Sequence, residues 1–207
     1  MKRRRHRKYR LISILSRPRI VLPVLGLASV SVLLSCASSP PKNVDNLCSI
    51  FKEKDGWYKD AQASEKRWGT PIQVQMAIIR QESSFKDDAQ PARRKLLGFV
   101  PWTRPSSAYG YPQAKDGTWD WYIKKTGNSG ADRDDFADAV DFVGWYTDMS
   151  QRKLGISKWD AYNQYLAYHE GHGGYQRKTF KGKSWLKPVA RKVDQQAKSY
   201  SAQLKGC

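Results

Sequence analysis

Apolar residues recur at helical spacing along most of this chain of 207 residues, and no segment of useful length alternates between apolar and polar residues as a half-buried strand does. In the clearest helix, Thr70 suits the N-cap, Pro71 the first helical position and Gln73 the third position of a capping box. Further helices are expected over about 134–153, from Ser157 to Gly171, and from near Ser184 to Leu204. The pattern predicts a mainly α fold.

The length and composition fit one folded domain with an irregular insertion. Hydrophobic residues make up 40% of the chain and include eight Trp, which excludes a solvated, unfolded polymer. No internal repeat is present. Residues 86–130 are rich in Pro, Gly, Tyr and Trp, and such long irregular segments are usually functional or mobile. We expect short helical turns or a small hairpin within them.

The formal charge of +18 is unevenly placed. Residues 1–35 hold nine basic residues and no acidic one, so 28 basic residues face 19 acidic ones in the remainder. The basic block is followed by an apolar run, Ile20 to Leu34, that Pro23 and Gly26 interrupt. This order is typical of a secretory signal, the alternative being an uncleaved membrane anchor. A positive exported domain suits an acidic polymer, and export together with the lack of a recognisable binding module disfavours nucleic acid.

The apolar run ends in Leu33-Leu34-Ser35-Cys36, which resembles a bacterial lipobox. Leu34 departs from the small residue usual at its position. The resemblance implies that residues 1–35 are a lipoprotein signal peptide and that Cys36 becomes the lipidated first residue, inserted in a membrane. Ala37, where an Asp would suggest inner-membrane retention, favours an outer-membrane lipoprotein facing the periplasm. An ordinary cleavage site beside an incidental cysteine is the alternative.

If lipid occupies Cys36, the two remaining cysteines, Cys48 and Cys207, can form one disulfide. An exported compartment permits such a bond, and it would join the two ends of the domain. Two unpaired thiols are the alternative. On this reading residues 36–47 are a short lipidated tether and residues 48–207 are the domain.

Glu82 is the strongest candidate for chemistry. It lies at the end of the helix that begins near Pro71, and its spacing from Ile78 and Ile79 places its carboxyl on the apolar face. Desolvation raises the pKa of a carboxyl group in such surroundings, which is what a general acid near neutral pH needs. The plainer interpretation is a helix-end Glu paired with Arg80 or Lys86.

Three segments resemble motifs of the soluble lytic transglycosylases and goose-type lysozymes, and they come in that family's order. They are the Glu-Ser motif in 79–85, a Gly-x-x-Gln segment in 109–113 followed by Thr118-Trp119, and 166–173, which is similar to an Ala-Tyr-Asn-Ala-Gly-x-Gly segment. Departures are His169, Glu170, Tyr111 and Pro112, together with a longer stretch before Gln113 that carries Arg93-Arg94-Lys95. They put the subfamily and the substrate preference in doubt more than the fold.

The resemblance implies a lysozyme-like fold for residues 48–207 and cleavage of the β-1,4 bond between N-acetylmuramic acid and N-acetylglucosamine in peptidoglycan. Glu82 would protonate the leaving oxygen and then, as a carboxylate, deprotonate the muramyl C6 hydroxyl, which gives a 1,6-anhydro product without a cofactor. Gln113 would offer an amide to the sugar. Ser83 and Tyr168 would orient Glu82 or bind substrate, unless they are a helix-end serine and a core tyrosine.

Two other functions stay open at this point. One is a hydrolytic muramidase, in which a second carboxylate activates water; the candidates are Asp87, Asp88, Asp116 and Glu170. The other is a peptidoglycan-binding lipoprotein without turnover. A metal site at His169, Glu170 and His172 is disfavoured, because only two histidines follow residue 36 and no ligand cysteine is free. Protein partners are not indicated.

Overall fold

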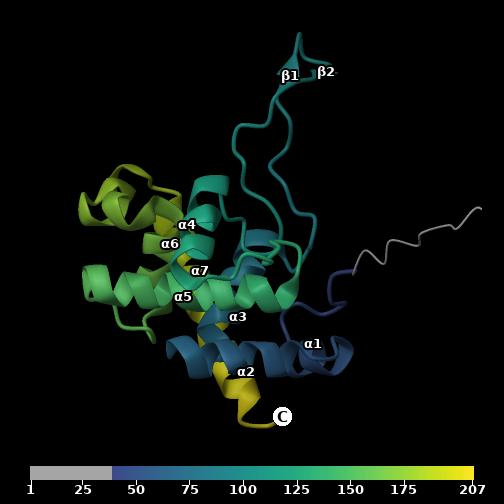
Figure 1. Ribbon diagram of the computed structural model, residues 1–207, viewed down its shortest axis with the longest axis vertical. Helices are drawn as coiled ribbons and strands as arrows, with labels where there is room; N and C mark the ends of the chain where they lie inside the picture. Colours follow the sequence, from purple (N-terminus) through teal and green to yellow (C-terminus); the bar gives the residue numbers. More distant parts are fainter. Residues whose placement is uncertain (1–38) are drawn as a thin grey trace, which may run out of the picture. The chain divides into compact units, whose positions relative to one another are not determined.

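The computed structural model describes residues 39–207, which are mainly helical as the sequence predicts (Figure 1). The predicted signal peptide, residues 1–35, and the predicted lipidation site Cys36 lie outside the described residues. The elements are α1 (Leu47–Glu53), α2 (Trp57–Trp68), α3 (Ile72–Ser83), β1 (Lys95–Leu96), β2 (Val100–Pro101), α4 (Asp116–Thr126), α5 (Phe136–Leu154), α6 (Ala161–Gln176), the 3-10 helix η1 (Thr179–Gly182) and α7 (Leu186–Leu204). Among the described residues, no helix has both the length and the apolar character needed to cross a membrane.

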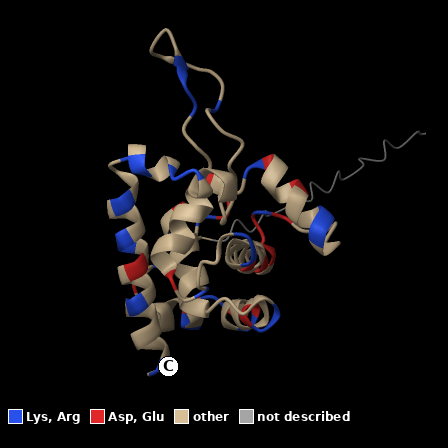
Figure 2. Cartoon of the chain, turned by 90° about the vertical axis from the view of Figure 1, so that its left-hand side faces the viewer, with Lys and Arg blue, Asp and Glu red and all other residues tan. Residues whose placement is uncertain are grey.

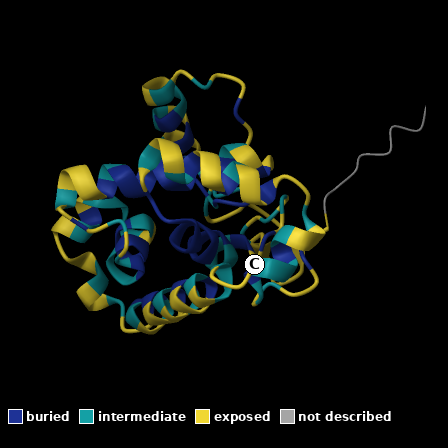
Figure 3. Ribbon diagram, turned by 90° about the horizontal axis from the view of Figure 1, so that it is seen from below, coloured by how far each residue is buried: buried dark blue, intermediate teal, exposed yellow. Residues whose placement is uncertain are grey.

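Helix α3 lies at the centre of the domain, in contact with α2, α5, α6 and α7. Nine of its twelve residues are buried, including the polar Gln73, Gln75 and Ser83, so little of the helix faces solvent. Figure 3 shows the buried residues gathered between the helices and the exposed residues on their outer faces. The end of α3 is therefore reached only through a gap between its neighbours.

The capping box predicted for α3 is wrong, because the side chain of Thr70 is used elsewhere. Pro71, with extended backbone angles, occupies the N-cap position instead of the first helical turn. The Thr70 hydroxyl lies 2.6 Å from the hydroxyl of Thr147 on α5, and the Gln75 amide donates to the Thr70 carbonyl over 2.6 Å. Thr70 thus joins the start of α3 to α5.

Helix α6 begins and ends later than the sequence suggests. Its N-cap is Asp160, whose carboxylate accepts a hydrogen bond from the backbone N–H of Asn163, so Ser157 does not cap it. Gly171, predicted as the end, is instead a kink at φ 73° and ψ 156°, after which the helix continues to Gln176. Only glycine adopts this backbone region readily.

The long segment 86–130 contains the small hairpin that was one of its two expected features, and it also contains a helix. A hairpin pairs Lys95 with Pro101 and Leu96 with Val100, and projects away from the helices (Figure 1). Helix α4 follows, and its Trp119 and Tyr122 are buried against α5. The eleven residues of α4 include only four apolar ones, which are too few to predict a helix from their spacing.

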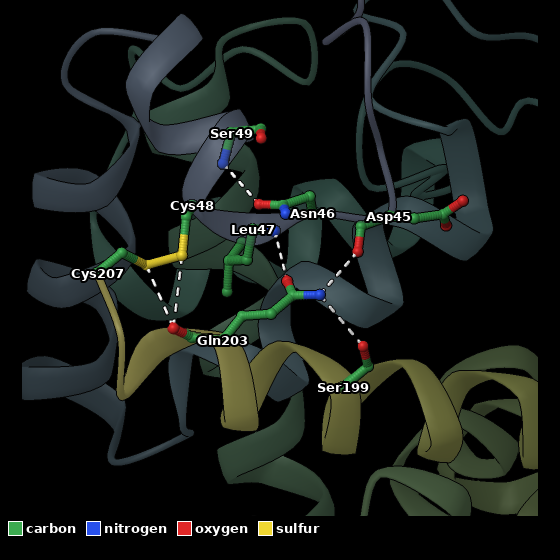
Figure 4. The surroundings of a disulfide bond; sticks show 8 residues. All are labelled: Asp45, Asn46, Leu47, Cys48, Ser49, Ser199, Gln203 and Cys207. Carbon is green, nitrogen blue, oxygen red and sulfur yellow. Dashed lines mark hydrogen bonds between the residues drawn. A yellow bond between two sulfur atoms is a disulfide. The ribbon is translucent and has the colours of Figure 1, made fainter.

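Cys48 and Cys207 are joined by a disulfide, with an S–S distance of 2.14 Å and a Cα–Cα distance of 5.8 Å (Figure 4). The bond spans 159 residues, and the chain-entropy model gives such a loop up to about 5 kcal/mol of stabilisation. Beside it, the Gln203 side chain accepts from Leu47 N–H at 2.7 Å and donates to the Asp45 carbonyl at 3.1 Å. Because the Tyr200 hydroxyl also donates to the Val44 carbonyl, this part of the predicted tether belongs to the folded domain.

Candidate active site

A cleft of about 450 Å³ opens at the C-terminal end of α3. Its walls come from the last turn of α3, the loop 108–118, α5, α6 and the segment between η1 and α7. Three of the four substrate or catalytic residues predicted from the sequence line this cleft: Glu82, Gln113 and Tyr168. The first and last motif segments, more than 80 residues apart in sequence, therefore meet at one cavity.

Glu82 is held by the termination of α3. Ser84 caps the helix in the left-handed region at φ 52°, and its N–H donates to the Arg80 carbonyl, so the helix ends at Ser83, one residue after Glu82. Oε1 of Glu82 is buried and has no hydrogen-bond partner among the described residues. A buried acceptor without a donor is costly, which makes this atom a position prepared for something that binds in the cleft.

The carboxyl of Glu82 is desolvated, and this raises its pKa from 4.5 to about 7. A hydrogen bond from Tyr165 acts in the opposite direction and lowers the pKa, but it does not outweigh burial. At neutral pH the group is therefore divided between its acid and its carboxylate forms. This is the state in which one residue can both give and take a proton.

Tyr165, on α6, contributes to the site although the family motif does not point to it. Its side chain is buried and hydrogen bonds to Glu82, and burial together with the neighbouring carboxyl raises the pKa of the phenol. Tyr165 is therefore a protonated donor at neutral pH. Helical spacing carries the only signal for it, since Tyr165 lies one turn before Tyr168 and His169.

Tyr168 lines the cleft, but its hydroxyl bonds to a backbone carbonyl. The hydroxyl donates to the carbonyl of Pro112 over 2.6 Å, which joins α6 to the loop that carries Gln113. Burial, with Glu82 nearby, raises the pKa of Tyr168 well above its usual value. Its role in the structure is thus to hold one wall of the cleft against another.

Gln113 sits in a tight turn at φ 49°, and its amide nitrogen donates to the carbonyls of Ala89 at 2.7 Å and Gly110 at 2.9 Å. A Cβ at Gly110 would lie 2.1 Å from the Arg133 carbonyl oxygen, so only glycine fits there. The nitrogen of the Gln113 amide therefore fixes the loop. The oxygen of the Gln113 amide is the atom that can accept a hydrogen bond from a sugar hydroxyl.

Ser83 does not line the cleft. It is buried, and its hydroxyl donates to the Ile79 carbonyl one turn earlier in α3 at 3.2 Å. Its position is that of a helix-end serine that bonds to its own helix, which is the plainer of the two interpretations of the sequence.

Glu170 is the second carboxyl of the cleft, and its surroundings are the reverse of those of Glu82. Burial alone would raise its pKa, but hydrogen bonds from Lys183, Thr179 and His169 outweigh burial and lower the pKa to about 2. Oε1 lies 2.5 Å from Lys183 Nζ and 3.0 Å from His169 Nδ1. Glu170 is thus a paired carboxylate, and Lys183 is a cation at the cleft wall that no sequence pattern indicated.

The other acidic candidates for a second catalytic group lie outside the lining of the cleft. Asp116 pairs with Arg133 at 2.9 Å, and neither Asp87 nor Asp88 lines the cavity. His172 stacks on Tyr146 with ring centroids 4.4 Å apart, and burial lowers its pKa to about 4. Between residues 39 and 207, no group of three or more His, Cys, Asp or Glu residues is arranged to hold a metal ion.

A mainly helical domain with a desolvated carboxyl in an open cleft is consistent with a lysozyme-like protein. The family model for the transglycosylase SLT domain matches residues 24–207, and the chain belongs to this family. At the level of the family it is a peptidoglycan-acting lytic transglycosylase. No curated protein matches the chain. No solved structure matches it either.

Replacement of Glu82 by Gln is expected to stabilise the protein at high pH and not at low pH. The folded state binds the Glu82 proton more tightly than the unfolded chain, so this contribution to stability is complete below pH 4.5 and is lost as the pH rises through about 7. The neutral amide of the Glu82→Gln variant does not titrate, so the variant does not lose this contribution to its free energy of unfolding as the pH rises. Urea unfolding at pH 4 and pH 8 should show that the advantage of Glu82→Gln grows by up to about 3 kcal/mol at the higher pH.

An equal difference between wild type and Glu82→Gln at both pH values would contradict the desolvated carboxyl. Glu53→Gln makes the same chemical change at an exposed position on α1 and serves as the matched control. Its stability relative to wild type should change little between the two pH values.

Proposed function

We propose that this protein cleaves the β-1,4 bond between N-acetylmuramic acid and N-acetylglucosamine of peptidoglycan with Glu82 as its single acid and base. In the first step the protonated Glu82 donates to the glycosidic oxygen, and the C1–O bond breaks as the N-acetyl oxygen of the muramyl sugar closes onto C1. In the second, the Glu82 carboxylate removes the proton of the C6 hydroxyl, whose oxygen then replaces the acetamido oxygen at C1. The product is a 1,6-anhydromuramyl end, and no water is consumed.

The observation that carries this proposal is the burial of the Glu82 carboxyl at the wall of the cleft, which raises its pKa to about 7. The first step needs the acid form and the second needs the carboxylate, and a group with a pKa near the working pH supplies both. The unpaired Oε1 of Glu82 is available for the proton that is transferred. Gln113 and Tyr168 hold the walls around it.

A hydrolytic muramidase on this fold is the less favoured alternative. That reaction needs a second carboxylate with a free oxygen to activate water or to stabilise the sugar cation. Glu170 is the acidic residue that shares the cleft lining with Glu82, and its two oxygens already accept from Lys183, His169 and Thr179. A non-catalytic binding protein would have no use for a desolvated carboxyl that lowers its stability.

The products of the reaction test the proposal directly. Wild type incubated with purified peptidoglycan should release anhydro-muropeptides, identified by mass spectrometry as lighter by one water than the corresponding hydrolysis products. Glu82→Gln should release none, with a loss of rate of at least about 1,000-fold, because the amide can neither donate nor accept the proton. Glu53→Gln should release the same products as wild type at a similar rate.

Reducing-end products from the wild type would show that the enzyme is a hydrolase and not a transglycosylase, and Glu170 would then be the candidate for the second carboxylate. Anhydro products from Glu82→Gln would remove Glu82 from its role. Pulldown of Glu82→Gln with insoluble peptidoglycan, with no product from wild type or variant, would favour a binding protein. Circular dichroism of each variant shows whether a loss of activity reflects a loss of fold.

We further propose that Cys36 carries a lipid and that the protein is an outer-membrane lipoprotein facing the periplasm. The support is the lipobox-like segment 33–36 and Ala37 after it. In cells fed a labelled fatty acid, the label should enter wild type and be absent from Cys36→Ala. Label retained by that variant would contradict lipidation at this cysteine.

A further inference from the structure

The hairpin arm, residues 92–104, carries an apolar tip that nothing in the domain covers. Leu97 is 79% exposed and Phe99 is 72% exposed, and both Leu96 and Val100 beside them are also exposed. A Cβ built on Gly98 at the turn would meet no atom within 4 Å. Soluble proteins seldom leave adjoining aliphatic and aromatic side chains in water unless the patch binds something.

The turn at the tip is built with a residue that the backbone does not favour. Leu97 and Gly98 both have positive φ, at 54° and 81°, and Phe99 N–H donates to the Leu96 carbonyl at 3.3 Å. Asn or Gly normally occupies the first central position of such a turn, and a leucine there is strained. An exposed, strained leucine does not serve folding, so its apolar side chain indicates a function outside the domain.

Below the tip the arm is basic. Its cations are Arg93, Arg94, Lys95 and Arg104, and no acidic residue occurs between Asp88 and Asp116. Figure 2 shows the arm with basic residues and no acidic residue above its base. Within the described chain, none of these four forms a salt bridge with a carboxylate; Arg93 bonds instead to the Trp102 carbonyl, and Arg104 bonds to the carbonyl of Pro91 just before the arm. Trp102, 56% exposed, lies within this basic collar, because its N–H donates to the Arg94 carbonyl at 2.7 Å.

We propose that the arm docks on a bilayer that contains anionic phospholipid, with Leu96, Leu97, Phe99 and Val100 among the acyl chains and the basic collar on the phosphates. An apolar tip with a tryptophan and cations together behind it matches the hydrocarbon of a lipid leaflet and the interface that carries its charged headgroups. Anionic lipid supplies the charge that the collar lacks within the protein. A glycan strand fits less well, because the tip offers leucine and valine and no amide or carboxylate for sugar hydroxyls.

This contact does not depend on a lipid at Cys36 or on the chemistry of Glu82. An N-terminal lipid would fix one end of the chain to a membrane, whereas the arm would fix the orientation of the domain on its surface. The arm also emerges between α3 and the loop of Gln113, so the contact would set the distance of the cleft from the bilayer.

The position of Trp102 in a membrane tests the proposal on the full chain. All eight tryptophans lie within the described residues, so their fluorescence reports only on the domain. With vesicles of phosphatidylethanolamine and phosphatidylglycerol that carry bromine on the acyl chains, part of the emission should be quenched. Trp102→Phe should remove most of that quenching, while Trp159→Phe, which removes a 69% exposed tryptophan elsewhere, should leave it unchanged.

A second variant separates the apolar tip from the fold of the turn. Leu97→Asn combined with Phe99→Ser removes the tip and places at 97 a residue that the positive φ favours. Brominated lipid should then no longer quench the fluorescence of Trp102, while the thermal stability of the protein and its cleavage of glycan in solution should stay unchanged. Vesicles of phosphatidylcholine alone should quench Trp102 less than anionic vesicles, and added salt should weaken the contact with anionic vesicles.

No quenching in wild type, or quenching that survives Trp102→Phe, would overturn the membrane contact. A loss of binding to purified peptidoglycan in the tip variant, with vesicle quenching unchanged, would make the arm a glycan site and would also overturn it. Loss of activity by Glu82→Gln leaves the quenching as in wild type, so the two proposals fail separately.

Discussion

The carboxyl of Glu82 sits at the end of the most buried helix of the domain, and its neighbours are arranged around this unfavourable placement. Desolvation raises the pKa to about 7, and the hydrogen bond from Tyr165 offsets part of that rise. Helix α3 has almost no exposed side, because α2, α5, α6 and α7 surround it. The Glu82 carboxyl would be more stable in water, and packing elsewhere in the fold holds it in its buried position.

The surroundings of the two carboxyl groups in the cleft shift their pKa values in opposite directions. Glu82 accepts from Tyr165, and its Oε1 has no partner among residues 39–207, so burial keeps its pKa near 7. Glu170 accepts from three donors, which lower its pKa to about 2, so it is a carboxylate at neutral pH. This division assigns proton transfer to Glu82 and leaves Glu170 to hold Lys183 at the cleft wall.

Much of the fold and of the site could be predicted from the sequence, and what could not has physical causes. Helical periodicity located α3, α5, α6 and α7, because each buries one continuous face. It missed α1, α2 and α4, whose exposed sides are long and whose buried residues are few. Thr70 was assigned to a cap, since local sequence cannot show that Thr147 competes for its hydroxyl. Lys183 enters the site through tertiary contacts alone, and the sequence signals Tyr165 only through its helical spacing from Tyr168 and His169.

Direct titration of the Glu82 carboxyl tests the central claim most closely. The chain has only four glutamates, so protein labelled with ¹³C at the side-chain carboxyl of Glu gives four carbon resonances to follow by NMR across pH. We expect the resonance that is absent from Glu82→Gln to titrate at about 7, with that of Glu170 at about 2. A Glu82 pKa close to 4.5, the ordinary value of a solvated carboxyl, would show that the cleft does not desolvate the group and would remove the basis for a single residue acting as both acid and base.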